Sequence, residues 1–208
     1  MVRVTLAPRE VLYVPGQPLK AVHFIESGVV SILTLLKNGD CAEVGVVGRE
    51  GMVGIPLIIG TGQSINEAMV LVSGQALRLG RADLATELQR SPAFAKLMMQ
   101  YVQSVYAQVS QTAACNAHHT LDERLARWLL LAHDRGDGDE LELTHEFLSM
   151  MLGVHRPAVS IAAGNLQKLG ILEYARGRIH ILDRPALEHA ACECYQAVQN
   201  HVLNIFNS

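Results

Sequence analysis

The sequence predicts an α+β fold in three parts: an N-terminal β-roll, one long helix and a C-terminal winged helix-turn-helix. Short Val- and Ile-rich segments separated by glycines run to about residue 85. A heptad-like apolar spacing follows from residue 91, and residues 143–181 read as helix, glycine turn, helix and hairpin. The predicted domains are residues 1–90 for the roll, 91–118 for the long helix and 119–208 for the winged helix-turn-helix.

The composition favours a cytoplasmic protein without a membrane segment. Half of the 208 residues are hydrophobic, yet no run approaches the ~18 apolar residues that a membrane helix needs. The N-terminal MVRVTLAPRE has no apolar signal core. The four cysteines are too few and too scattered to predict a disulfide framework.

The N-terminal half carries the signals of a barrel or roll built from short strands. Glycines such as Gly28 and Gly74 are interpreted as breaks between strands, and Asn38-Gly39 is typical of a hairpin turn. The candidate strands lie at residues 11–14, 21–25, 29–33 and 69–72.

The long helix should begin at Ser91-Pro92, because serine caps a helix and proline suits its first turn. Six of its residues then recur at spacings of four and three, which is the a/d pattern of a coiled coil. We expect this face to form a dimer seam; packing on the chain's own β domain is the alternative, and the two are not exclusive. The seam residues are Met98, Val102, Val105, Val109, Thr112 and Asn116.

Two further helices are expected in the C-terminal part, at residues 120–132 and 186–205. Between residues 143 and 181, Thr144 is a plausible N-cap, Gly153 supplies the turn, and Pro157 suits the start of the second helix. The buried face of that second helix should consist of Val159, Ala162, Ala163, Leu166 and Leu169. A helix-turn-helix of this kind can lay its second helix in the major groove, so the sequence predicts a DNA-binding regulator.

The charge distribution agrees with DNA binding at one place only. The chain has a net charge of −3, but residues 143–181 carry four Arg or Lys against two Glu, a local excess of two positive charges. The acidic loop at residues 134–142 is expected to face away from DNA.

The order of these parts resembles the cyclic-AMP receptor and fumarate–nitrate regulator (Crp–Fnr) family. The resemblance rests on Phe24-Ile-Glu-Ser-Gly28 in the roll and on Leu152-Gly-Val-His-Arg-Pro-Ala-Val-Ser160 in the helix-turn-helix, and it extends over essentially the whole chain. It implies a cyclic-nucleotide-binding-like jelly roll and a homodimer that binds double-stranded DNA at palindromic operators, with RNA polymerase as a further partner. The familiar leading helix is missing from the pattern.

The resemblance also locates an effector site, but this sequence departs from the nucleotide-binding pattern. Ile55 and Pro56 stand where the family's ribose-binding Glu is expected, and Ile65 and Asn66 stand where its phosphate-binding Arg is expected. Without that cation a cyclic phosphate would depend on backbone amides alone, so a cyclic nucleotide is not expected as cofactor. The candidate pocket residues are Gly51, Gly54, Ile55, Pro56, Asn66, Glu67 and Ala68, with Ser110 opposite.

For DNA, the resemblance places a base-reading Arg at Arg156, where a guanidinium can match guanine O6 and N7. His155 and Ser160 are candidates for base or phosphate contacts, while Pro157 and Ile161 replace a Glu and an Arg of the family. This predicts a different operator, with an apolar contact to a thymine methyl. The expected phosphate contacts are Thr144, Lys168, Arg176 and Arg178.

Other chemistry finds little support in the sequence. It contains no G-x-S-x-G, HExxH, P-loop or GxGxxG motif, so no enzyme and no catalytic residue are predicted. Cys115, His118 and His119 share a helix face but lack a fourth ligand, so no metal site is predicted. Two rivals stay open: a conventional cyclic-nucleotide-responsive activator, and an interaction module whose helix-turn-helix does not bind DNA.

Overall fold

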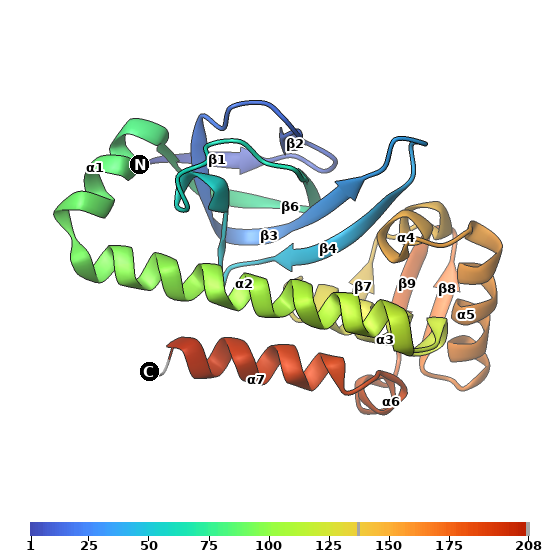
Figure 1. The fold of residues 1–208 in the computed structure, drawn as a ribbon. Helices are drawn as coiled ribbons and strands as arrows, with labels where there is room; N and C mark the ends of the chain where they lie inside the picture. The colour runs from blue at the N-terminus through green and yellow to red at the C-terminus, as the bar shows by residue number, and fades with distance from the viewer. Residues whose placement is uncertain (137, 207–208) are drawn as a thin grey trace.

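The structure is a computed structural model that describes residues 1–136 and 138–206, with side chains described up to residue 200. The loop at residues 134–142 and the predicted 119–208 domain therefore include positions, residues 137 and 207–208, outside the described residues. The chain forms a curved β-sheet domain, a long helix beneath it and a smaller helical domain at one end (Figure 1).

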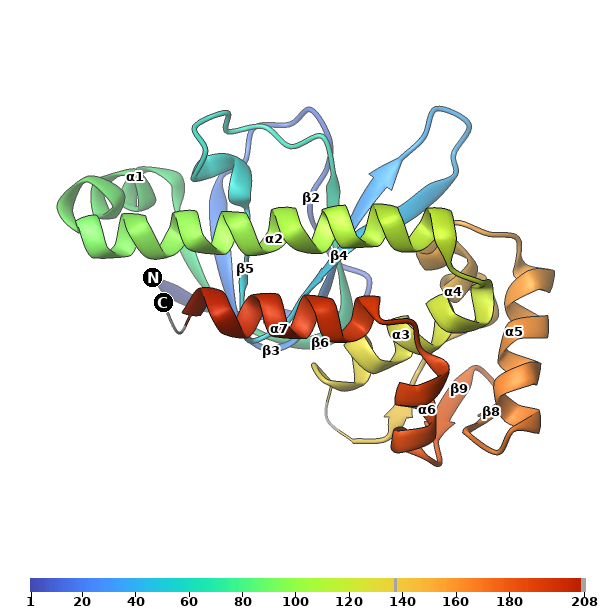
Figure 2. The same ribbon diagram turned by 60° about the horizontal axis from the view of Figure 1, so that its bottom comes forward.

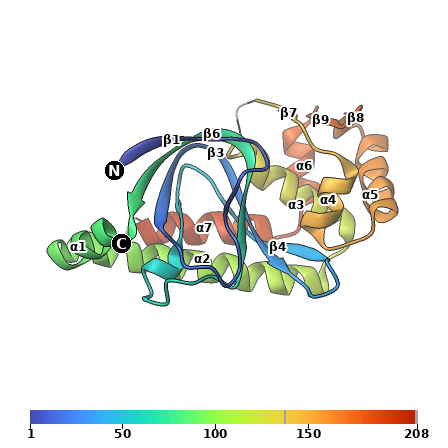
Figure 3. The ribbon, with the colours of Figure 1, turned by 90° about the horizontal axis from the view of Figure 1, so that it is seen from above.

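The N-terminal sheet is antiparallel and rolled, as Figure 3 shows from above. Its strand order is β1-β6-β3-β4, with β2 paired to β6 and β5 to β3. The expected hairpin joins β3 to β4, and Gly39 at its tip has a φ of 90°. The elements are β1 (Val2–Leu6), β2 (Val11–Tyr13), β3 (Ala21–Leu35), β4 (Cys41–Val47), β5 (Met52–Val53), the 3-10 helix η1 (Ile55–Leu57) and β6 (Glu67–Gly80).

The interpretation of Gly28 and Gly74 as strand breaks was wrong. Both lie inside long strands that pair with each other, β3 and β6, with register shifts between Ile25 and Val30. A Cβ at Gly74 would lie 2.0 Å from the carbonyl oxygen of Ser27. These glycines therefore permit two backbones to approach closely, so that the strands bend into a roll without ending.

Two helices follow the roll: α1 (Arg81–Arg90) and α2 (Pro92–His118). The predicted start of α2 is confirmed, because the Ser91 hydroxyl accepts a hydrogen bond from the Phe94 amide. Gln108 holds the middle of α2 to β4 by exchanging two hydrogen bonds with the Val46 backbone, 3.2 and 3.3 Å long.

The C-terminal domain packs around α3, whose Thr120–Glu123 capping box fixes its start. Its core includes Leu33 of β3, so the roll and this domain share buried surface. Leu169, expected in the core, is 72% exposed because α5 ends just before it. The elements are α3 (Leu121–His133), β7 (Glu140–Leu141), α4 (His145–Leu152), α5 (Arg156–Lys168), β8 (Leu172–Ala175), β9 (Arg178–Ile181), α6 (Arg184–Ala190) and α7 (Cys194–Phe206).

The single C-terminal helix expected at residues 186–205 is two helices, α6 and α7, broken at residues 191–193. After the break α7 runs back alongside α2, as Figures 1 and 2 show. A polar network fixes the turn: Asp134 at the end of α3 accepts hydrogen bonds from Arg184 (2.6 Å) and from the Tyr195 hydroxyl (2.9 Å). In the part of the chain that the structure describes, no helix is both long and apolar enough to cross a membrane.

Candidate DNA-binding and effector sites

The turn between α4 and α5 is built as the sequence indicates. The Thr144 hydroxyl accepts a hydrogen bond from the Phe147 amide, 3.1 Å away, and starts α4. Gly153 ends α4 with a φ of 63°, a conformation that costs a residue with a side chain about 1 kcal/mol or more. The buried faces of the two helices then pack together and on α3, which leaves the opposite face of α5 toward solvent.

That outer face of α5 presents the predicted DNA-reading residues. His155, Arg156, Pro157 and Ser160 are all exposed in the first turns of the helix. Ile161 lies beside them and is 67% exposed, so a large apolar side chain stands on this surface. In Figure 1, α5 forms the outer edge of the domain, with β8 and β9 next to it.

A histidine that sequence reasoning missed connects this helix to the hairpin. His145 stacks on Tyr174 of β8 with 4.0 Å between ring centroids, and its Nδ1 lies 2.9 Å from the Ser160 hydroxyl. Burial, together with the charge of Arg156, lowers the pKa of His145. The ring thus links α4 and α5 to the wing, which is the β8–β9 hairpin.

The wing is only partly what the sequence predicts. Arg176 lies at the exposed hairpin tip with a φ of 52°, and Lys168 is exposed in the last turn of α5. Arg178, in contrast, forms ion pairs with Glu140 (3.2 Å) and Glu142 (3.4 Å). These two carboxylates belong to the acidic loop that was expected to face away from DNA, and they lie at the wing because β7 pairs with β9.

The effector candidates of the roll form two groups, one at β5 and η1 and one at the start of β6. Gly51 lies directly under α2, where an added Cβ would come within 2.5 Å of the Tyr101 hydroxyl. Ile55 packs in an apolar cluster with Tyr101 and Val105 of α2. In the second group Asn66 donates to the Thr34 hydroxyl (2.9 Å), Glu67 is half-buried and Ala68 is fully buried, while Ser110 of α2 is exposed.

In residues 51–68, called the cassette below, three backbone amides around the 3-10 helix are already used within the fold. The amides of Leu57, Ile58 and Gly62 donate to backbone carbonyls within the cassette, at 2.8–3.0 Å, and Pro56 has no N–H. One cation does approach from outside: a Cβ at Gly62 would lie 3.0 Å from the guanidinium of Arg81 in α1. Sequence reasoning missed Arg81 because it lies beyond the cassette in the chain.

A separate groove of about 860 Å³ lies between the roll and the helices α1 and α2. Its described lining contains none of the predicted effector residues. It is lined by Met1, Phe24, Leu77, Leu79, Asp83, Thr86, Glu87, Arg90, Ser91 and Phe94.

The predicted seam residues follow one stripe along α2, and they differ in how far the chain's own domains bury them. Met98 is buried and Val105 packs against the roll, so these two serve the intramolecular alternative. Val102, Val109 and Thr112 are half-buried and Asn116 is exposed. The exposed Met99 and Tyr106 lie close to them along the helix and widen the outward apolar face.

A buried carboxyl joins the roll to the DNA-binding domain. Glu43 of β4 accepts hydrogen bonds from the Ser31 hydroxyl (2.5 Å) and from the indole N–H of Trp128 in α3 (2.7 Å). Burial raises the pKa of Glu43 to about 7, although these bonds and the nearby Arg127 and Arg135 act in the opposite direction.

Comparison with known protein families gives two matches that together span both domains. The model described as a cyclic nucleotide-binding domain matches residues 3–91, and the one described as a Crp-like helix-turn-helix domain matches residues 123–190.

Named relatives and a solved structure agree with these matches. The chain is 25% identical to the transcriptional regulator LdrP of Thermus thermophilus over 203 residues, which is 92% of this chain and 97% of LdrP. It is 24% identical to the global nitrogen regulator of Synechocystis sp. over 186 residues, covering 85% and 82%. The structure of FixK2 from Bradyrhizobium japonicum superposes with a TM-score of 0.78 at 17% identity, covering 92% and 97%, which shows a shared fold.

Proposed function

Because the chain belongs to the Crp–Fnr family of transcriptional regulators, we propose that it binds a palindromic operator as a homodimer and reads it through α5. The observation that supports this proposal is the exposure of the first turns of α5. Arg156 and Ile161 project from a helix whose opposite face is buried, so the reading face is rigidly placed.

Each residue of the face has a distinct role in this proposal. Arg156 forms a bidentate contact with guanine, and Ile161 contacts a thymine methyl group. Ser160, already bonded to His145, adds a polar contact only if its hydroxyl turns outward. Arg176 and Lys168 bind phosphates and set the register without reading sequence.

Arg178 differs from Arg176, the other arginine of the wing, in its interaction partners. Its guanidinium is shared between Glu140 and Glu142, so a phosphate would have to compete with two carboxylates. We propose that Arg178 chiefly fixes β7 against the wing and contributes little to DNA affinity.

We propose further that the roll responds to something other than a cyclic nucleotide. Three features support this: Ile55 and Pro56 provide no ribose acceptor, the amides of Leu57, Ile58 and Gly62 are engaged, and no Arg lies within the cassette. Arg81 of α1 lies outside the cassette, and its guanidinium approaches Gly62.

Dimerisation would use the outward face of α2, with Val102, Val109 and Asn116 against their counterparts. In such a dimer, a two-fold axis along α2 would place the two α5 helices in successive major grooves, about one helical turn apart. In this proposal the protein acts as a DNA-binding regulator in the cytoplasm and is not an enzyme.

The test compares Arg156→Ala with Arg49→Ala, an exposed arginine on a loop of the roll. Binding to a selected operator is followed by fluorescence anisotropy. Loss of a bidentate base contact should weaken binding about 10- to 100-fold in R156A, while R49A should resemble the wild type. Equal affinities for R156A and R49A would contradict the assignment of Arg156 as a base-reading residue, whereas a wild type that binds no selected DNA would favour an interaction-only module.

A further inference from the structure

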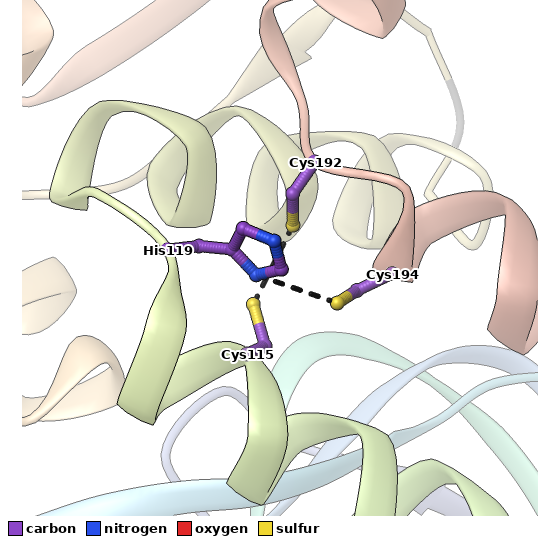
Figure 4. Close-up of side chains that lie close together, drawn as sticks. All are labelled: Cys115, His119, Cys192 and Cys194. Atoms are coloured by element: carbon purple, nitrogen blue, oxygen red, sulfur yellow. Dashed lines mark hydrogen bonds between the residues drawn. The ribbon is translucent and has the colours of Figure 1, made fainter.

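Four metal-binding side chains from distant parts of the sequence meet where α2 ends. Cys115 and His119 lie one helical turn apart at the C-terminal end of α2, and Cys192 and Cys194 lie at the break between α6 and α7. Figure 4 shows the four side chains converging from these two segments. One donor atom from each lies within 4.8 Å of every other.

The spacing of these donors suits a single tetrahedral ion. With zinc–sulfur bonds of about 2.3 Å, the edges of such a tetrahedron measure about 3.8 Å. The Sγ atoms of Cys115 and Cys192 are 3.5 Å apart, and Cys194 Sγ lies 3.6 Å from Nδ1 of His119. Three cysteines and one histidine are a ligand set that structural zinc sites use.

The polar neighbours of these four side chains are of the kind found around metal ligands. The other nitrogen of His119, Nε2, lies 3.1 Å from the carboxylate of Glu193, which would fix the ring with Nδ1 toward the metal. The side-chain amide of Gln111 donates to the Cys194 sulfur over 3.0 Å, a bond that a thiolate accepts better than a thiol.

Ordinary apolar packing accounts poorly for this arrangement. Buried cysteines often act as small hydrophobic residues, and all three here are at most 5% exposed. They form a cluster of their own, however, separate from the leucine-rich core of the domain. A disulfide between Cys115 and Cys192 would leave Cys194, His119 and their polar partners without a role.

We propose that Cys115, His119, Cys192 and Cys194 bind one Zn²⁺ ion that fastens the C-terminal helices to the end of α2. Binding displaces the thiol protons into solvent, and the metal then closes a loop of 77 residues between Cys115 and Cys192. The zinc site lies beside residues 119–120, where α2 passes into α3. Zinc occupancy therefore determines how firmly the C-terminal domain is held to the long helix.

The first experiment measures metal in the full-length protein purified without chelator after expression in zinc-supplemented medium. Elemental analysis should find close to one zinc per chain in the wild type. The variants Cys192→Ser and Cys194→Ser should contain almost none. The matched control is Cys41→Ser, which removes the one cysteine outside the cluster and should keep its zinc.

A second set of variants guards against misfolding of the cysteine variants. His119→Gln and Glu193→Gln change partly exposed positions, and circular dichroism should show both folded. Zinc affinity, measured by competition with a chromogenic chelator, should fall about tenfold or more in E193Q and further in H119Q. Cobalt added to the metal-free wild type should give the ligand-field absorption of a tetrahedral thiolate site.

Three results would overturn the proposal. One is a wild-type protein that binds neither zinc nor cobalt. Another is zinc retained equally by C194S, H119Q and C41S. The third is a Cys115–Cys192 disulfide found by mass spectrometry in protein that has never been reduced, with no metal present.

Discussion

The buried carboxyl between the two domains predicts a specific dependence of stability on pH. Glu43 touches Ser31 in the roll and Trp128 in the DNA-binding domain, and its pKa is raised to about 7 because it is desolvated. The substitution Glu43→Gln imitates the protonated carboxyl, since the amide can donate to Ser31 and accept from Trp128. We expect this variant to lose the pH dependence that Glu43 causes.

The sign and size follow from linkage. Between pH 4.5 and about 7, Glu43 keeps its proton in the folded protein and loses it in the unfolded chain. The free energy of unfolding of the wild type therefore decreases as pH rises through this window and is constant above it. A pKa of about 7 against 4.5, at about 1.4 kcal/mol per pH unit, gives a decrease of about 3 kcal/mol.

The assay is urea unfolding between pH 4.5 and 8.5 for the wild type, Glu43→Gln and the control Glu173→Gln, an exposed carboxyl on the wing. Trp128 is the only tryptophan in the sequence, and its N–H bonds to Glu43, so its fluorescence reports both unfolding and ionisation. The difference between wild type and E43Q should grow by about 3 kcal/mol from the low to the high end of the range. Parallel pH profiles for wild type and E43Q would refute the reasoning.

Three further predictions concern the turn, the seam and the reading helix. Gly153→Ala should lower the free energy of unfolding by about 1–2 kcal/mol, because residue 153 has a left-handed φ. Gly164→Ala should raise it by up to about 1 kcal/mol, because residue 164 lies inside α5 and a Cβ there meets nothing within 4 Å. Equal urea midpoints for the two variants would contradict this. Val109→Asp should convert the dimer to a monomer in light-scattering measurements, and an unchanged mass would exclude the outward face of α2 as the seam. Replacing the contacted thymine by uracil should weaken wild-type binding by about 0.8 kcal/mol and leave Ile161→Ala unaffected; equal losses would argue against the methyl contact.

Local patterns in the sequence were sufficient for the helix-turn-helix. Its signals lie within a few residues of one another: the Thr144 cap, the Gly153 turn, Pro157 at the start of α5 and the apolar faces between them. The same holds for the start of α2 at Ser91-Pro92. Fold class and element order follow from such local signals together with the family resemblance.

Features that depend on contacts across the fold were missed or misread. In the sequence, Gly28 and Gly74 look like turn glycines. Only the pairing of β3 with β6 shows that they allow the backbones of two paired strands to approach closely. Arg178 looks like a free wing cation until β7 brings Glu140 beside it.

The cysteines show the same limit. Cys115 and His119 share a helix face that sequence can recognise, but their partners Cys192 and Cys194 reach them only because the C-terminal helix breaks and turns back along α2. Leu169 was assigned to the core by periodicity, and it is exposed because the helix ends one residue earlier.

Selection of bound sequences from random DNA tests the central proposal most directly. The purified full-length protein is used without nucleotide, with cyclic AMP and with cyclic GMP, and R156A serves as the comparison. The proposal predicts enrichment of a palindrome by the wild type without any nucleotide, with the pattern lost or altered at one position of each half-site in R156A. A palindrome enriched only when a cyclic nucleotide is present, or no enrichment under any condition, would contradict it.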